Sequence, residues 1–178
     1  MLMANEPWKQ APGVWPTKAA FFSWLRGGLR KSIWQFYPPK LEFKNEACHT
    51  PPEGYTGRAK TGTYCALTGE WTGKSKLEVD HIKGNASLTD WDDVLSFIQH
   101  LCCDKGNMQL VDKEAHKIKS YAEKHGLSFE LALITKKVIA LEKSKQVVVF
   151  LKEKGIIPAS NAKARRQQCI DILKGETK

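Results

Sequence analysis

The chain contains LEVDHIKGN at residues 77–85 and GNMQLVDKEAHKIKS at residues 106–120. The first segment sets the carboxylate of Asp80 beside the imidazole of His81, directly after a short apolar run. The second segment places His116 nine residues after Asn107. Carboxylates, imidazoles and amides are the groups that hydrolytic and metal-binding sites use. We therefore expect the chemistry of this protein to be concentrated in these two segments.

Short apolar runs at residues 64–67 and 77–79 are separated by the turn-rich TGEWTGKSK, which predicts a hairpin leading into Asp80. Between the two segments, Thr89 and Asp92 have the spacing of a capping box. A helix inserted into the motif is expected to follow and to end near residue 102. Its predicted apolar stripe consists of Trp91, Val94, Leu95, Ile98 and Leu101.

With these residues at this spacing, the chain resembles the HNH endonucleases, most closely the short free-standing enzymes of tailed bacteriophages. The resemblance implies a ββα-metal unit over about residues 64–122, in which two strands and a helix grip one divalent metal ion. It implies that Asp80 and His116 hold the metal, that His81 is the general base, and that Asn107 positions the loop and His81. Neighbours on a regular strand point to opposite faces, so Asp80 and His81 share a site only where the strand ends or bends.

Phosphodiester hydrolysis needs a nucleophilic water, a base and positive charge near the phosphate. Carboxylate and water ligands favour Mg²⁺ or Mn²⁺, while imidazole also draws Ni²⁺ or Zn²⁺. Many relatives in the resembled family add a structural zinc held by two CxxC pairs. This chain has Cys65-Ala-Leu-Thr68 and Asp112-Lys-Glu-Ala115 at those places, so no structural zinc is expected. No CxxC pair occurs among the five cysteines, which favours free thiols.

A formal charge of +9 and a pI near 9.3 favour a polyanionic partner, here DNA. No small-molecule cofactor is expected. The basic side chains expected to hold the nucleic acid are Lys113, Lys117, Lys119, Arg165 and Arg166. For any one of them, a solvated surface position is the alternative. The chain has no run of the ~20 apolar residues that span a bilayer and no secretory pattern, so no membrane partner and a cytoplasmic location are expected, in a host cell if the origin is a phage.

The expected fold class is α+β and mostly helical, with an HNH core, a helical insertion and flanking helices. We expect an arm, a helix and a Pro/Gly-rich connection in residues 1–63, the nuclease core in residues 64–125, and a helical extension in residues 126–178. Thr17, Asp112 and Ser128 are predicted helix caps. Residues 38–63 are predicted to hold at most short strands.

A non-catalytic DNA-binding module on an HNH scaffold is the rival interpretation. The presence of all four motif residues favours the enzyme, because binding alone would not require them. Trp15, Trp24, Trp34 and Trp71 could stack on unpaired bases, although core packing is the preferred interpretation. The sequence leaves open the target site, nicking or double-strand cleavage, DNA or RNA preference, homing or phage DNA processing, and the oligomeric state.

Overall fold

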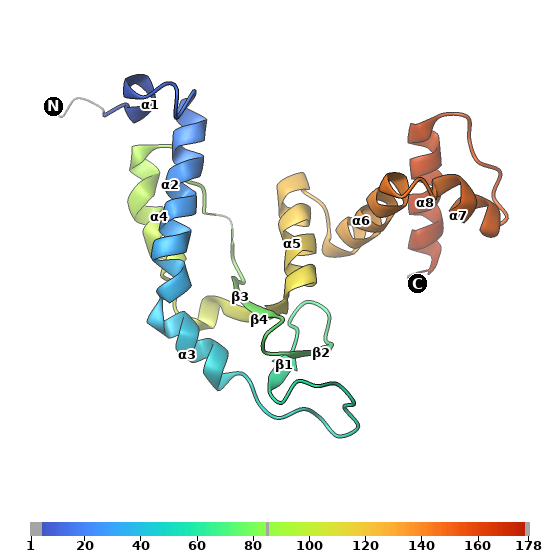
Figure 1. Ribbon diagram of the computed structural model, residues 1–178, viewed down its shortest axis with the longest axis horizontal. Coiled ribbons are helices and arrows are strands. Elements are labelled where there is room, and N and C mark those ends of the chain that lie inside the picture. Colours follow the sequence, from blue (N-terminus) through green and yellow to red (C-terminus); the bar gives the residue numbers. More distant parts are fainter. Residues whose placement is uncertain (1–4, 85, 177–178) are drawn as a thin grey trace. The chain divides into compact units, whose positions relative to one another are not determined.

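The computed structural model describes residues 5–84 and 86–176, and it divides the chain into two compact units, Met1–Asp112 and Lys113–Lys178 (Figure 1). Helices make up 56% of the chain and two small antiparallel sheets accompany them, so the predicted α+β, mostly helical class is confirmed. Within the described ranges, none of the helices combines the length and the apolar character that crossing a bilayer requires.

The first unit opens with helices α1 (Pro7–Gln10), α2 (Lys18–Ser32) and α3 (Pro38–Glu46), with a 3₁₀ turn, η1 (Trp34–Phe36), before α3. Thr17 caps α2 as predicted, because its hydroxyl accepts a hydrogen bond from the Ala20 amide at 3.1 Å. The expectation of an irregular connection from residue 38 was wrong for its first part. Two prolines occupy the first turn of α3, where their missing amide hydrogens are not needed.

Two separate ribbons replace the predicted hairpin. Strand β1 (Gly62–Tyr64) pairs with β2 (Trp71–Gly73), and β3 (Leu77–His81) pairs with β4 (Met108–Asp112), both antiparallel. The Ala66 amide donates to the Leu110 carbonyl at 2.9 Å, so the turn after β1 lies along β4. The apolar run at residues 64–67 therefore starts at the end of β1, whereas the run at residues 77–79 lies in β3 and pairs with β4.

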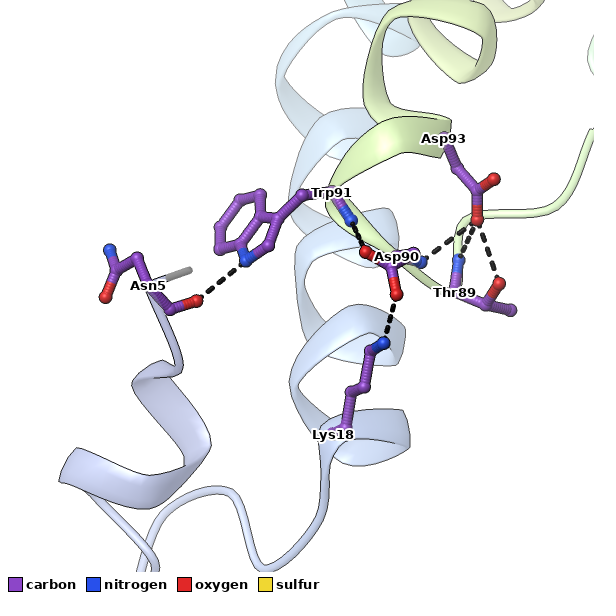
Figure 2. Close-up of polar contacts among 6 residues, drawn as sticks. All are labelled: Asn5, Lys18, Thr89, Asp90, Trp91 and Asp93. Atoms are coloured by element: carbon purple, nitrogen blue, oxygen red, sulfur yellow. Dashed lines mark hydrogen bonds and ion pairs between the residues drawn. The ribbon is translucent and has the colours of Figure 1, made fainter. Parts of the chain in front are cut away.

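A helical insertion lies between β3 and β4, as predicted. It contains η2 (Trp91–Asp93), α4 (Val94–Leu101) and η3 (Lys105–Asn107). The capping box is one residue later than predicted, because the cap is Asp90 and its reciprocal partner is Asp93 rather than Asp92 (Figure 2).

The start of the insertion is tied to the N-terminal segment. The Asp90 carboxylate pairs with the Lys18 ammonium of α2, and the Trp91 indole N–H donates to the Asn5 carbonyl at 2.7 Å (Figure 2). Thr89 also donates its amide and its hydroxyl to Asp93, each at 2.8 Å. These contacts hold η2 against the chain's first helices.

Two apolar clusters stabilise the first unit. One joins α2 to α4 and consists of Phe21, Phe22, Leu88, Phe97 and Leu101, with Trp8 and Trp15 packed against it. The other lies on one face of the β3–β4 ribbon and consists of Leu77, Val79, Met108 and Leu110, with Trp34, Tyr37 and Phe43 packed against it. Each fully buried side chain of this size contributes about 1.5–3 kcal/mol. The predicted stripe of α4 was partly wrong, because Leu95 is 67% exposed and Phe97 is buried instead.

The second unit contains helices α5 (Lys113–His125), α6 (Phe129–Lys143), α7 (Val147–Glu153) and α8 (Ala162–Glu176). Gly126 follows α5 with φ near +62°, a conformation that glycine adopts without strain. The Ser128 hydroxyl caps α6 as predicted, accepting from the Leu131 amide at 3.2 Å. Val138, Leu151 and Cys169 form the buried core that joins α6, α7 and α8.

Candidate functional site

Asp80 is a buried carboxylate on the β3–β4 ribbon, with 9% of its surface exposed. The strand register pairs it with Gln109, whose side-chain amide donates to Asp80 Oδ2 at 2.9 Å. A hydrogen-bonded amide fixes the orientation of a carboxylate in the way that outer-shell partners orient metal ligands. The ribbon therefore presents Asp80 in a defined orientation.

His81 is the last paired residue of β3, opposite Met108, and its side chain is half-buried. Its Nε2 lies 3.3 Å from the carbonyl oxygen of Leu101, at the end of α4. A carbonyl can only accept, so this contact places the hydrogen on Nε2. In the neutral ring Nδ1 is then the basic nitrogen.

Two aromatic rings stack on the His81 imidazole. The Trp34 centroid lies 4.3 Å away with an interplanar angle of 29°, and the His100 centroid lies 5.1 Å away with an angle of 21°. Both rings are therefore stacked with the imidazole rather than set edge-on to it.

Burial lowers the pKa of His81 below its ordinary value, because it disfavours the imidazolium. The Leu101 carbonyl and the Asp80 carboxylate act in the other direction, while His100 and Arg30 reinforce the lowering. The net effect keeps His81 neutral near pH 7, the state in which an imidazole can accept a proton.

Asp80 and His81 follow the alternation of a regular strand. The Asp80 carboxylate bonds across the ladder to Gln109, whereas the His81 ring contacts Trp34, which packs with the opposite, apolar face. Strand pairing continues through His81 and ends there, so the two residues lie at the end of the ribbon. The Asp80 carboxylate acts to raise the pKa of the imidazole, against the larger lowering by burial.

Asn107 holds the loop that follows His81. Its side-chain oxygen accepts from the Lys83 amide at 3.0 Å, and its Nδ2 donates to the Lys83 carbonyl at 3.5 Å. Its own carbonyl accepts from the Ile82 amide at 2.9 Å. Asn107 thus joins the end of the insertion to the first residues after His81.

His116 belongs to the second unit, where it is the half-buried fourth residue of α5. The structure thus brings Asp80, His81 and Asn107 together within the first unit, and His116 is described on its own helix. Among residues 5–84 and 86–176, no group of three or more His, Cys, Asp and Glu side chains is placed to hold a metal. The metal site expected from the resemblance has only two protein ligands, Asp80 and His116, which are fewer than such a group requires.

Cys65 occupies a place where the resembled family has a zinc ligand. Its buried Sγ accepts a hydrogen bond from the Asp112 amide at 3.2 Å, which joins the turn after β1 to the end of β4. Burial raises the pKa of this thiol, but hydrogen bonds from Asp112, Thr68 and Leu67 outweigh burial and lower the pKa overall. All five cysteines carry free thiols.

No family model, curated protein or solved structure matches this chain. A function must therefore be argued from the residues and their geometry.

The positive charge is concentrated in the second unit. Residues 113–178 contain 15 Lys and Arg against 7 Asp and Glu, whereas residues 1–112 contain 13 against 12. The formal charges that follow are +8 and +1. Any attraction of a polyanion by net charge therefore comes mainly from the C-terminal helices.

Several of the basic residues predicted to bind nucleic acid already have partners. Lys117 pairs with Glu114 at 2.6 Å and Lys119 with Glu123 at 3.5 Å. Arg166 pairs with Glu142 at 3.5 Å, and Arg165 donates to the carbonyls of Ala159 and Ser160, each at 2.8 Å. Lys113 is exposed. The Lys117–Glu114 pair is exposed and weak enough for phosphate to compete with it. The Lys119 side chain is only 14% exposed, and Arg165 has a structural contact at the start of α8.

The sequence prediction missed four contributors to the site: Trp34, Gln109, His100 and the Leu101 carbonyl. Gln109 could be found only by knowing that β3 pairs with β4. The other three come from η1 and α4, and no local pattern in the sequence links them to His81. An open depression of about 560 Å³ lined by Lys44, Lys60 and Lys74 was also not anticipated.

Proposed function

We propose that this protein is a metal-dependent endonuclease of the HNH type that hydrolyses phosphodiester bonds in DNA. The observation that carries the proposal is the state of His81. A backbone carbonyl fixes its tautomer, burial keeps it neutral, and a buried carboxylate precedes it on the same strand. A histidine on a β-ribbon needs none of these features to fold, but a general base benefits from all of them.

In this proposal, Nδ1 of His81 takes the proton of the attacking water. Nε2–H stays bonded to the Leu101 carbonyl and holds the ring at a constant angle while the proton moves. The charge that would develop on the ring is favoured by the Asp80 carboxylate, which opposes the lowering of the His81 pKa by burial. Asn107 keeps the following loop in place by its two contacts to Lys83.

Asp80 and His116 would hold one divalent ion, which in the active enzyme would be Mg²⁺ or Mn²⁺. Their chemistry fits such an ion, since a carboxylate oxygen and an imidazole are both common ligands and the Gln109 amide orients the carboxylate. When bound, the ion supplies positive charge for the phosphate and the leaving oxygen. In this proposal the two residues belong to the ββα unit that the resemblance implies over about residues 64–122.

DNA is the proposed substrate because the second unit carries a formal charge of +8. Lys113, Lys117 and Lys119 lie on α5 with His116, and Arg166 lies on α8. Displacing counterions from phosphates by such side chains gives affinity independent of base sequence. A phage enzyme of this kind would act in the cytoplasm of its host.

Conversion of supercoiled plasmid tests the function. The wild-type chain should give nicked or linear DNA with Mg²⁺ or Mn²⁺ and none with EDTA. His81→Ala should lower the rate by about 10²–10⁴-fold, the usual contribution of a general base, and His116→Ala should abolish cutting unless metal is raised. His49→Ala and His125→Ala are matched controls that should cut like the wild type.

The alternative of a DNA-binding module has a different outcome. It requires that the wild-type chain shifts duplex DNA in a gel but converts no plasmid with any of Mg²⁺, Mn²⁺, Ni²⁺ or Zn²⁺. His81→Ala would then bind and behave like the wild type in every assay.

A further inference from the structure

The residues that contact the His81 ring lie outside the motif of Asp80, His81, Asn107 and His116. Trp34 comes from η1, near the N-terminus, and His100 and Leu101 come from the last turn of α4. These contacts are two stacked rings and one hydrogen bond at Nε2. The insertion and the N-terminal region therefore meet at the imidazole.

The Leu101 carbonyl is available for this contact because of its position in the helix. The last carbonyls of an α-helix have no amide partner within that helix. α4 ends at Leu101, and the next amide, from Cys102, bonds back to Ile98 at 2.9 Å. The Nε2–H of His81 thus donates to the Leu101 carbonyl, which has no amide partner within α4.

His100 contributes a flat ring rather than a hydrogen bond through its buried nitrogen. Within the described part of the chain, His100 Nε2 is buried and has no hydrogen-bond partner. A buried polar atom without a partner destabilises a protein. His100 stacks on His81, so a phenyl ring should serve at this position.

Trp34 is itself braced by Tyr37 and by Lys40 of α3. The Lys40 ammonium donates to the Trp34 carbonyl at 3.1 Å and lies 5.0 Å from the centre of its ring. Tyr37 stacks on Trp34 at 6.1 Å, and its hydroxyl donates to the Cys102 carbonyl at 3.1 Å. Since Cys102 follows Leu101, these contacts connect η1 to the same end of α4 that binds Nε2.

We propose that Trp34 and His100 are positioning residues for His81. They fix the plane and the direction of its imidazole, so that Nδ1 faces the reacting water. This inference rests on the proposed endonuclease function. Misplacing a reacting group by about 1 Å can slow a reaction by about 10²-fold, so even a modest ring rotation is measurable.

The test compares variants that keep or remove a flat ring. His100→Phe keeps the ring and should cut plasmid within about twofold of the wild-type rate, whereas His100→Leu and Trp34→Leu should lower kcat about tenfold with little change in KM. Trp91→Leu is the matched control, because its ring packs on Phe21 and Phe22. It should lose stability and keep kcat.

A second readout does not require activity. In ¹⁵N NMR spectra, protonated and unprotonated imidazole nitrogens resonate far apart, and the His81 signals are assigned by their loss in His81→Gln. The wild-type protein and His100→Phe should show the Nε2–H form of His81. His100→Leu and Trp34→Leu should show a mixture of both tautomers.

Retained kcat and a single tautomer in both leucine variants would overturn the inference, as would an equal loss of kcat in Trp91→Leu. A wild-type chain that never cuts would defeat the endonuclease proposal instead. In that event the NMR comparison still decides whether Trp34 and His100 hold the ring.

Discussion

Replacing Asn107 by alanine should loosen the loop after β3. The variant loses the 3.0 Å hydrogen bond from the Lys83 amide and the 3.5 Å contact to the Lys83 carbonyl. The second contact is at the limit of a hydrogen bond and contributes little. The first contributes about 0.5–1.5 kcal/mol net, so the free energy of unfolding should fall by about 1 kcal/mol.

Tryptophan fluorescence during urea unfolding measures this loss of stability in the first unit, which contains Asn107. All six tryptophans precede residue 92, so their emission reports the first unit alone. Asn107→Asp is the control, because it keeps an acceptor for the Lys83 amide and should stay within about 0.5 kcal/mol of the wild type. Equal stability of Asn107→Ala and the wild type would refute the role assigned to this side chain.

Three further outcomes follow from the structure. Leu151→Ala should destabilise the second unit by about 2–5 kcal/mol in circular dichroism melts, whereas Ile157→Ala, at a side chain 87% exposed, should change stability by less than about 0.5 kcal/mol. Thr17→Ala should lose about 1 kcal/mol by removing the cap on the Ala20 amide, measured by tryptophan fluorescence in urea. Because burial lowers the pKa of His81 in the folded state, its contribution to stability is complete above the unfolded pKa of about 6.5 and is lost as the pH falls through the lower folded value. In EDTA, the wild-type chain should therefore lose more stability between about pH 7.5 and pH 5 than His81→Gln, and parallel losses would contradict this assignment.

Local features of the fold could be predicted from the sequence, and non-local ones could not. The caps at Thr17 and Ser128 were correct because each depends on one hydroxyl and an amide three residues later. Helix α3 was missed because its prolines were interpreted as breakers, although they occupy the first turn. The pairing of β3 with β4 was missed because a helical insertion separates the two strands.

The same distinction applies to the candidate site. Asp80, His81, Asn107 and His116 could be selected from residue types and spacing. Their supports are contacts between distant segments, such as the Gln109 amide on Asp80 and the Trp34 ring on His81. A pattern along the chain contains no information about strand register or about which helix end meets a given ring.

The central claim is that this protein cuts DNA with His81 as the base and a divalent ion as its partner. The most direct measurement is a time course of supercoiled plasmid with wild-type and His81→Ala chains purified side by side, in Mg²⁺ or Mn²⁺, then in EDTA, then with metal restored. We expect the wild-type chain to cut, to stop in EDTA and to resume with metal, while His81→Ala cuts at least about 10²-fold more slowly throughout. Equal cutting by the two preparations, or no cutting by the wild-type chain under any of these conditions, would contradict the account.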